Sequence, residues 1–79
     1  MDYSDSDLPV ELSEGDVATL ADGTTVRYEE NGGARDVMLG GEWSPTCSLF
    51  PGNTHTLVAG EKTYVLTAMD STLKVESRG

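Results

Sequence analysis

Apolar and polar positions alternate in short runs along most of this chain, from about residue 14 to its end. The runs are rich in β-branched and aromatic residues, and turn-forming sequences follow one another about every eight to twelve residues. These turn signals are EGD, ADG, NGG, LGGE, PGN, AGE and MDS. From Val17 onward, no stretch keeps apolar residues at helical spacing over several turns. The pattern therefore predicts an all-β domain over residues 13–79, a small antiparallel barrel or sandwich of about five to six short strands.

The C-terminal run shows the clearest alternation. If Asp70-Ser71 is a two-residue hairpin turn, one face of the hairpin is apolar and the other is mostly polar. The apolar face comprises Tyr64, Leu66, Ala68, Leu73 and Val75, with Ala68 opposite Leu73 and Leu66 opposite Val75. A charge at the centre of this face would have no partner, so we expect Leu66→Asp to unfold the domain.

A second hairpin is predicted around Asp22-Gly23. With these two residues as a primed turn, Leu20 pairs with Thr25 and Thr19 pairs with Val26. This register places Val17, Thr19, Val26 and Tyr28 on one face, and Ala18, Leu20, Thr25 and Arg27 on the other.

The segment between these hairpins contains the only tryptophan. Val37 and Leu39 indicate a strand, Gly40-Gly41 interrupt it, and Pro45 favours a loop or a sheet edge over a central strand. Tryptophan is enriched among the residues that dominate protein interfaces, so Trp43, Glu42 and Pro45 are candidate partner-binding residues. The alternative for Trp43 is that it covers one end of a small core.

The acidic residues are concentrated near the N-terminus. The first sixteen residues carry six acids and no base, and the whole chain has a net charge of −9 from fourteen acids and five bases. We expect residues 1–12 to form a mobile acidic arm, or alternatively a short helix that starts at Ser4 with Asp7 three residues later. The arm would offer Asp2, Asp5 and Asp7 to a protein partner.

The net charge limits the classes of partner. Phosphate backbones and anionic membranes would be repelled, so we expect no direct binding to nucleic acid or membrane. The acidity is consistent with solubility, with a halophilic-like adaptation to high salt, or with mimicry of a nucleic acid. A mimic must hold its acids in rows on a rigid surface, and a mobile arm counts against that.

Cys47 and His55 stand on either side of Pro51-Gly52-Asn53, in a stretch that looks like a turn between two strands. If the two strands form a hairpin, the Cys47 and His55 side chains lie on the same face only when the loop has three residues. They are then diagonal neighbours, about 7–8 Å apart. We therefore expect no catalytic dyad, with Leu49 and Leu57 in the core and His55 near solvent. One thiol and one imidazole are also too few for a structural zinc site, so no metal and no cofactor are expected.

Two stretches resemble known families. FPGNTHTL is similar to the second motif of cupin barrels, in which a Pro-Gly turn precedes a metal-ligating histidine, and the resemblance implies that role for His55. The first cupin motif, with two histidines and a glutamate, has no counterpart in this chain. EGDVATLADGTTV resembles the opening hairpin of small SH3-like and sandwich domains.

These observations favour a non-enzymatic module that acts through protein contacts, such as a structural subunit of a larger assembly, for example a viral one. The alternative is a small acidic inhibitor of the counter-defence type, which blocks a nucleic-acid-binding enzyme by charge mimicry. The chain shows no signal peptide and no run of about 18 apolar residues, so a soluble, cytoplasmic protein is expected. Self-association into a homo-oligomer is compatible with all of these features.

Overall fold

The structure is a computed structural model that describes residues 1–41 and 44–78. In this part of the chain there are nine β-strands and one 3-10 turn (Asp5–Asp7), and there is no α-helix. The strands are β1 (Asp2–Ser4), β2 (Val10–Leu12), β3 (Val17–Thr19), β4 (Thr25–Asn31), β5 (Ala34–Leu39), β6 (Cys47–Leu49), β7 (Thr54–Ala59), β8 (Lys62–Ala68) and β9 (Leu73–Ser77). The all-β prediction is confirmed, but the number of strands is larger than the five or six expected.

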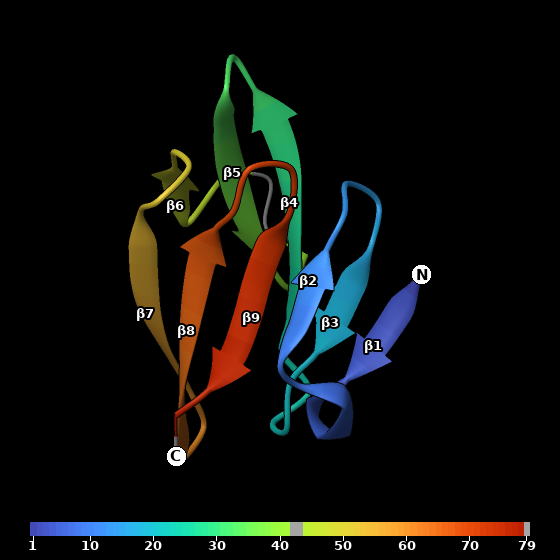
Figure 1. The fold of residues 1–79 in the computed structure, drawn as a ribbon. Helices are drawn as coiled ribbons and strands as arrows, with labels where there is room; N and C mark the ends of the chain where they lie inside the picture. The colour runs from blue at the N-terminus through green and yellow to red at the C-terminus, as the bar shows by residue number, and fades with distance from the viewer. Residues whose placement is uncertain (42–43, 79) are drawn as a thin grey trace.

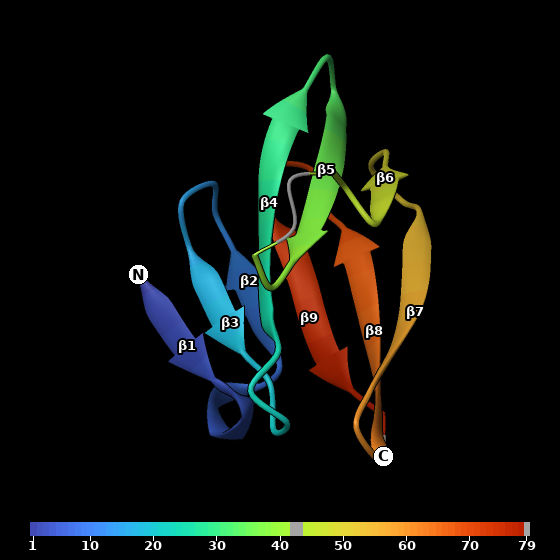
Figure 2. The ribbon, with the colours of Figure 1, turned by 180° about the vertical axis from the view of Figure 1, so that it is seen from behind.

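The strands form two sheets that face each other (Figure 1). Sheet A has the strand order β1-β3-β4-β5-β6, and sheet B has the order β2-β9-β8-β7. Figure 2, the view from behind, again places β1 and β7 at opposite edges of the molecule. Within the described residues no strand pairing joins the two sheets, so the barrel alternative is wrong and two packed sheets take its place.

The core lies between the sheets and is built from alternate residues of their strands. Its fully buried large side chains come from both sheets and from both ends of the chain: Leu12, Val26, Val37, Tyr64, Leu66, Leu73 and Val75. Alternation buries one face of each strand because successive side chains point to opposite sides of a sheet.

The C-terminal hairpin has the predicted register. Ala68 lies opposite Leu73, Leu66 lies opposite Val75, and all four are buried. The Met69 N–H donates to the Thr72 carbonyl at 2.8 Å, which closes the turn around Asp70-Ser71.

The register predicted for β3 and β4 is wrong by one residue. Ala18 pairs with Val26 and Thr19 pairs with Thr25, and the Leu20 N–H donates to the Thr24 carbonyl at 2.7 Å. The loop therefore contains three residues, and its last one, Gly23, has a positive φ of 91° that only glycine adopts easily. The shift places Ala18 and Leu20 in the core beside Val26 and Tyr28, and leaves Thr19 exposed.

Residues 1–12 differ from the expected mobile arm, because they contribute a strand to each sheet. β1 pairs with β3 in parallel, which is an exception to the expected antiparallel arrangement, and β2 pairs with β9. Leu12 is fully buried. The stretch lacks a clear period because its strands are three residues long and belong to different sheets. The alternative helix is a single 3-10 turn, in which Asp7 accepts a hydrogen bond from the Ser4 N–H at 2.8 Å.

Pro51-Gly52-Asn53 form the predicted turn between two strands, but those strands do not form a hairpin. β6 pairs with β5 in sheet A, and β7 pairs with β8 in sheet B. The turn therefore carries the chain from one sheet to the other. Leu49 and Leu57 are buried in the core as expected. In the described part of the chain no helix is long and apolar enough to cross a membrane.

Candidate functional site: an acid-lined hollow beside strand β4

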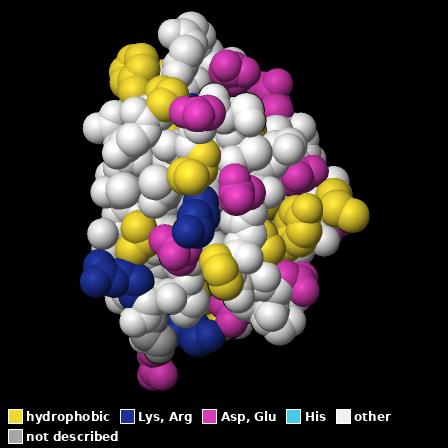
Figure 3. All heavy atoms as spheres, in the orientation of Figure 1, with side chains coloured by type: hydrophobic (Ala, Val, Ile, Leu, Met, Phe, Trp, Pro, Cys, Tyr) yellow, Lys and Arg dark blue, Asp and Glu magenta, His cyan; other side chains and the backbone are white. Residues whose placement is uncertain are grey.

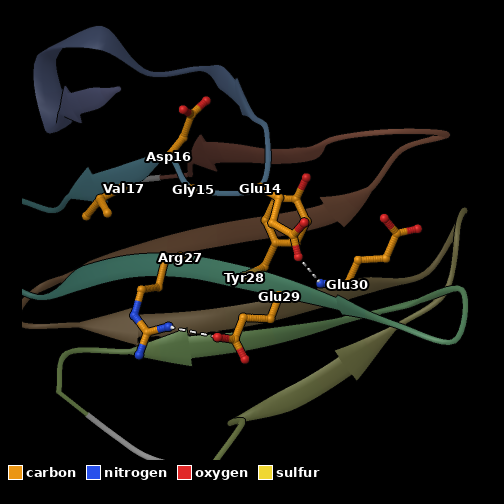
Figure 4. A pocket seen from close by; sticks show the side chains of 8 residues that line it. All are labelled: Glu14, Gly15, Asp16, Val17, Arg27, Tyr28, Glu29 and Glu30. Carbon is orange, nitrogen blue, oxygen red and sulfur yellow. Dashed lines mark hydrogen bonds and ion pairs between the residues drawn. The ribbon is translucent and has the colours of Figure 1, made fainter.

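A surface depression lies where β3 separates from β4. It has a volume of about 390 Å³ and is lined by Glu14, Gly15, Asp16, Val17, Arg27, Tyr28, Glu29 and Glu30 (Figure 4). We call this depression the acidic hollow, because four of its eight lining residues carry carboxylates.

The hollow arises from a difference in strand length. β4 has seven residues and β3 has three, so β4 extends beyond the last paired position at Ala18 and Val26. Continuation of this register would place Glu14 opposite Glu30. There the Glu14 side chain replaces a backbone partner, and its Oε2 accepts the Glu30 N–H at 2.8 Å (Figure 4). The exposed edge of β4 is thus covered by a carboxylate instead of a neighbouring strand.

The other carboxylates of the hollow are held in different ways. Asp16 Oδ1 accepts a hydrogen bond from the N-terminal ammonium at 3.0 Å, and Asp16 Oδ2 accepts one from the Ser13 N–H at 2.9 Å. Arg27 Nη1 lies 3.9 Å from Glu29 Oε1, and Figure 4 shows this pair on the opposite side of β4 from Glu14. The acidic side chains therefore surround the depression from both sides of the strand.

Two of the groups that line the hollow have shifted pKa values. The Ser13 amide and, secondarily, the N-terminal ammonium hold the pKa of Asp16 below its ordinary value. A carboxylic acid that donates protons near neutral pH needs a raised pKa instead. The hydroxyl of Tyr28 has a pKa above its ordinary value, chiefly because the ring is buried. The hollow thus combines three exposed glutamates with an aspartate whose ionised form is stabilised, next to the buried Tyr28.

Of the predicted partner-binding residues, the three aspartates lie in the N-terminal segment but have different surroundings. Asp2 is exposed in β1, and Asp7 is exposed and bonded to Ser4. Asp5 is bound within the molecule, because its Oδ2 accepts a bond from Lys62 Nζ at 2.8 Å and its Oδ1 accepts one from the Tyr64 hydroxyl at 2.7 Å. Partner binding by these residues stays a prediction.

Pro45 is exposed between β5 and β6. Glu42 and Trp43 lie outside the described residues, so the hypothesis of a contact centred on Trp43 stays a prediction. The acidic hollow brings together none of the predicted site residues. Its members Glu14 and Asp16 belong to the acidic first sixteen residues. Glu14 comes to lie beside Glu30 only in the observed register of β3 and β4, continued beyond Ala18, and the predicted register differs from it by one residue.

Cys47 and His55 lie in different sheets, and both are partly buried. Burial, together with the nearby Asp36 carboxylate, raises the pKa of the Cys47 thiol, which makes it a weaker nucleophile at neutral pH. His55 lies between solvent and core, at the end of the inward-facing row that includes the buried Leu57 and Ala59. Across the described residues, no group of three or more His, Cys, Asp and Glu side chains could hold a metal ion.

Arg35 is a buried charged residue that the sequence pattern did not reveal. Its side chain is only 3% exposed, and its Nη2 donates to the Asp70 carbonyl at 2.8 Å. The Tyr28 hydroxyl donates to the adjacent Ser71 carbonyl at 3.5 Å, so both side chains contact the β8–β9 turn from sheet A. Arg35 Nη1 has no hydrogen-bond partner in the described part of the structure. The arginine therefore fastens one sheet to the turn of the other.

Comparisons with known proteins and structures find no match to this chain. No protein-family model matches the chain, and the searches of curated proteins and of solved structures find no significant similarity.

Proposed function

We propose that this protein is a non-enzymatic protein-binding module that receives a basic side chain of its partner in the acidic hollow. The observation that carries the proposal is the group of carboxylates of Glu14, Asp16, Glu29 and Glu30 around a depression of about 390 Å³. The depression is large enough for an extended lysine or arginine side chain, and the buried Tyr28 contributes to its wall.

The proposal agrees with the charge of the whole chain. A net charge of −9 attracts a basic partner from a distance and accelerates encounter, while the hollow supplies a local contact. Figure 3 shows acidic side chains at several places on this face of the molecule, with lysine and arginine side chains between them, so attraction is not limited to one patch. The hollow would then determine the site at which a partner attracted by the net charge binds.

A charge-mimicking inhibitor is the second candidate, and the N-terminal segment favours it. Mimicry requires acids on a rigid surface, and residues 2–12 are paired into both sheets. Asp5, Asp7 and Asp16 are each fixed by hydrogen bonds. Such an inhibitor would use many carboxylates spread over the surface to occupy the nucleic-acid groove of another protein.

Two triple variants with equal charge separate the candidates. The hollow variant carries Glu14→Gln, Glu29→Gln and Glu30→Gln, and the control variant carries Glu11→Gln, Glu61→Gln and Glu76→Gln on other surfaces. Each is immobilised with the wild type for affinity capture from cell lysate, and captured proteins are identified by mass spectrometry. The binding-module proposal expects a partner that the wild type and the control retain and the hollow variant loses.

The outcome for mimicry is different. A mimic should capture a nucleic-acid-binding protein that free DNA displaces, and both triple variants should weaken capture by similar amounts because they remove the same charge. Equal retention of every captured protein by all three proteins would contradict both candidates. Trp43→Ala, added as a fourth protein, tests the separate hypothesis of a contact through the tryptophan.

A further inference from the structure

The four edges of the two sheets are not alike. Three of the edge strands, β1, β2 and β6, have only three residues each. β1 and β2 carry the acids Asp2 and Glu11, and β6 lies between Pro45 and Pro51. Short length, charge and proline are the usual features that prevent a sheet edge from pairing with another molecule.

β7 lacks all of these protections. It has six residues, Thr-His-Thr-Leu-Val-Ala, and contains no acid, lysine, arginine or proline. It forms the outer edge of sheet B, as both ribbon views show (Figures 1 and 2). Its threonines and Val58 have high β-propensity, and the Val58 side chain is 68% exposed.

The hydrogen-bonding pattern of sheet B determines which backbone groups β7 presents. The Ala68 N–H donates to the Asn53 carbonyl at 3.0 Å, and on the other side of β8 the Arg78 N–H donates to the Thr63 carbonyl at 2.7 Å. Both bonds fix the same alternation, in which residues 55, 57 and 59 of β7 bond to β8. Thr54, Thr56 and Val58 therefore direct their N–H and C=O groups away from the sheet, to the free edge.

We propose that β7 pairs with β7 of a second copy of this chain, in antiparallel orientation about a two-fold axis at Thr56. Thr56 then lies opposite its own equivalent, and Thr54 lies opposite Val58 of the other copy. All three positions have outward-facing backbone groups, so the pairing forms about six hydrogen bonds. The two four-stranded sheets become one continuous sheet, and each exposed Val58 packs against a threonine methyl group.

The charges of the molecule favour a second copy over a basic partner at this edge. An edge that recruits a basic segment would be expected to carry acids beside the incoming strand, but β7 has none. Two molecules with a charge of −9 repel each other, and an uncharged strand lets them approach without placing carboxylates opposite one another. The β7 edge is also separate from the acidic hollow, which lies beside β4 in sheet A. A dimer would thus display two hollows.

Sedimentation equilibrium over a wide range of protein concentration tests the proposal, with Val58→Lys as the test variant and Val65→Lys as the matched control. Val65 lies on the same outer face, directly beside Thr56, but in β8, where strands on both sides use the backbone groups. The wild type and Val65→Lys should form a dimer of about twice 8.4 kDa. Val58→Lys places two like charges near the pairing and should raise the dimer dissociation constant at least about tenfold.

Amide hydrogen exchange gives a second readout that does not depend on the variants. The N–H groups of Thr54, Thr56 and Val58 should become protected as wild-type concentration rises, whereas those of β1 and β6 should not change. A wild type that stays monomeric at every concentration would overturn the proposal. So would a dimer that Val58→Lys leaves intact, or concentration-dependent protection at another edge. Loss of the dimer with unchanged capture of a partner would leave the hollow as the binding site.

Discussion

Asp5 connects the N-terminal segment to sheet B through two charged or polar partners. Its carboxylate accepts hydrogen bonds from Lys62 and from Tyr64. Both bonds hold the pKa of Asp5 below its ordinary value, and the bond from Lys62 has the larger effect. The same contact raises the pKa of Lys62. The residue was a candidate for binding a partner, and both of its oxygens are engaged inside the molecule.

This contact predicts a specific pH dependence of stability. A carboxyl group with a lower pKa in the folded state stabilises the fold above its unfolded pKa, which is about 3.9, and loses that contribution as the pH falls through the folded value. Lys62, with a raised pKa, contributes below its unfolded pKa of about 10.4 and loses this contribution as the pH rises through the folded value.

Urea unfolding of the wild type and Asp5→Asn across this range measures the effect. The stability difference should be constant near neutral pH and should shrink in acid, because protonation of Asp5 abolishes the charge that the variant lacks. Tyr64→Phe, which removes only the hydroxyl, should cost about 1 kcal/mol near neutral pH. A difference between wild type and Asp5→Asn that persists unchanged in strong acid would contradict the assignment.

Gly60, in the turn between β7 and β8, is constrained in two ways. Its φ is positive at 65°, and a Cβ placed there would lie 3.0 Å from the Asp22 Cβ of the β3–β4 loop. Gly60→Ala should therefore destabilise the protein by about 1–2 kcal/mol through backbone conformation, with a further cost from the contact.

Two other glycines separate these causes in thermal unfolding. Gly33 has a positive φ of 89° but open space where a Cβ would lie, so Gly33→Ala reports the backbone cost alone. Gly41 has neither constraint, and Gly41→Ala should stay within about 0.5 kcal/mol of the wild type. Equal effects at positions 60 and 33 would show that the two turns do not approach each other.

Among the secondary-structure elements, the β8–β9 hairpin has the best-determined register. Leu66 lies at its centre, fully buried opposite Val75. Leu66→Asp should leave no folded protein in circular dichroism and proton NMR spectra, because the carboxylate would be buried without a partner. Thr67→Asp is the matched control, since Thr67 faces outward beside Lys74 and should tolerate a charge. A folded Leu66→Asp protein would mean that this face is not the core face.

The sequence predicted the register of a hairpin correctly where the residues next to the turn allow only one strand pairing. Asp70-Ser71 lies between two runs whose alternation is broken only by Val65, so one register buries Leu66, Ala68, Leu73 and Val75 together. Ala21-Asp22-Gly23 accepts either a two-residue or a three-residue loop, and burial of Ala18 and Leu20 decides for the longer one. A local sequence cannot tell whether a strand pairs with its predecessor or enters the other sheet, and β6 and β7 show the second case.

The candidate site was less predictable than the fold. Glu14 and Glu30 are sixteen positions apart, and they meet only because β3 is shorter than β4. The orientation of Arg35 likewise depends on the β8–β9 turn reaching it from the opposite sheet. Such contacts arise from the arrangement of elements and leave no periodic pattern in the sequence.

For the whole molecule, the N-terminal segment is part of the packed domain. Deletion of residues 1–12 removes β1, β2 and the fully buried Leu12. Loss of a buried leucine side chain alone costs about 2–5 kcal/mol, and a domain of this size has little stability in excess of that. The truncated chain should therefore show no cooperative thermal transition, whereas Leu12→Ala should show one at reduced temperature. A truncated chain that melts like the wild type would indicate an independent arm.

The pairing of β2 with β9 also determines when folding can finish during synthesis. Val10 lies beside Val75 and Leu12 beside Leu73, so β2 cannot complete its pairing until β9 has been synthesised. Until then, the growing chain exposes the apolar residues that β9 will cover. β9 lies between β2 and β8, so without it neither of these two strands has that neighbour in sheet B. Sheet B is thus completed only once β9 has been synthesised, and a chain that stops before residue 73 presents chaperones and proteases with an open, unfinished sheet.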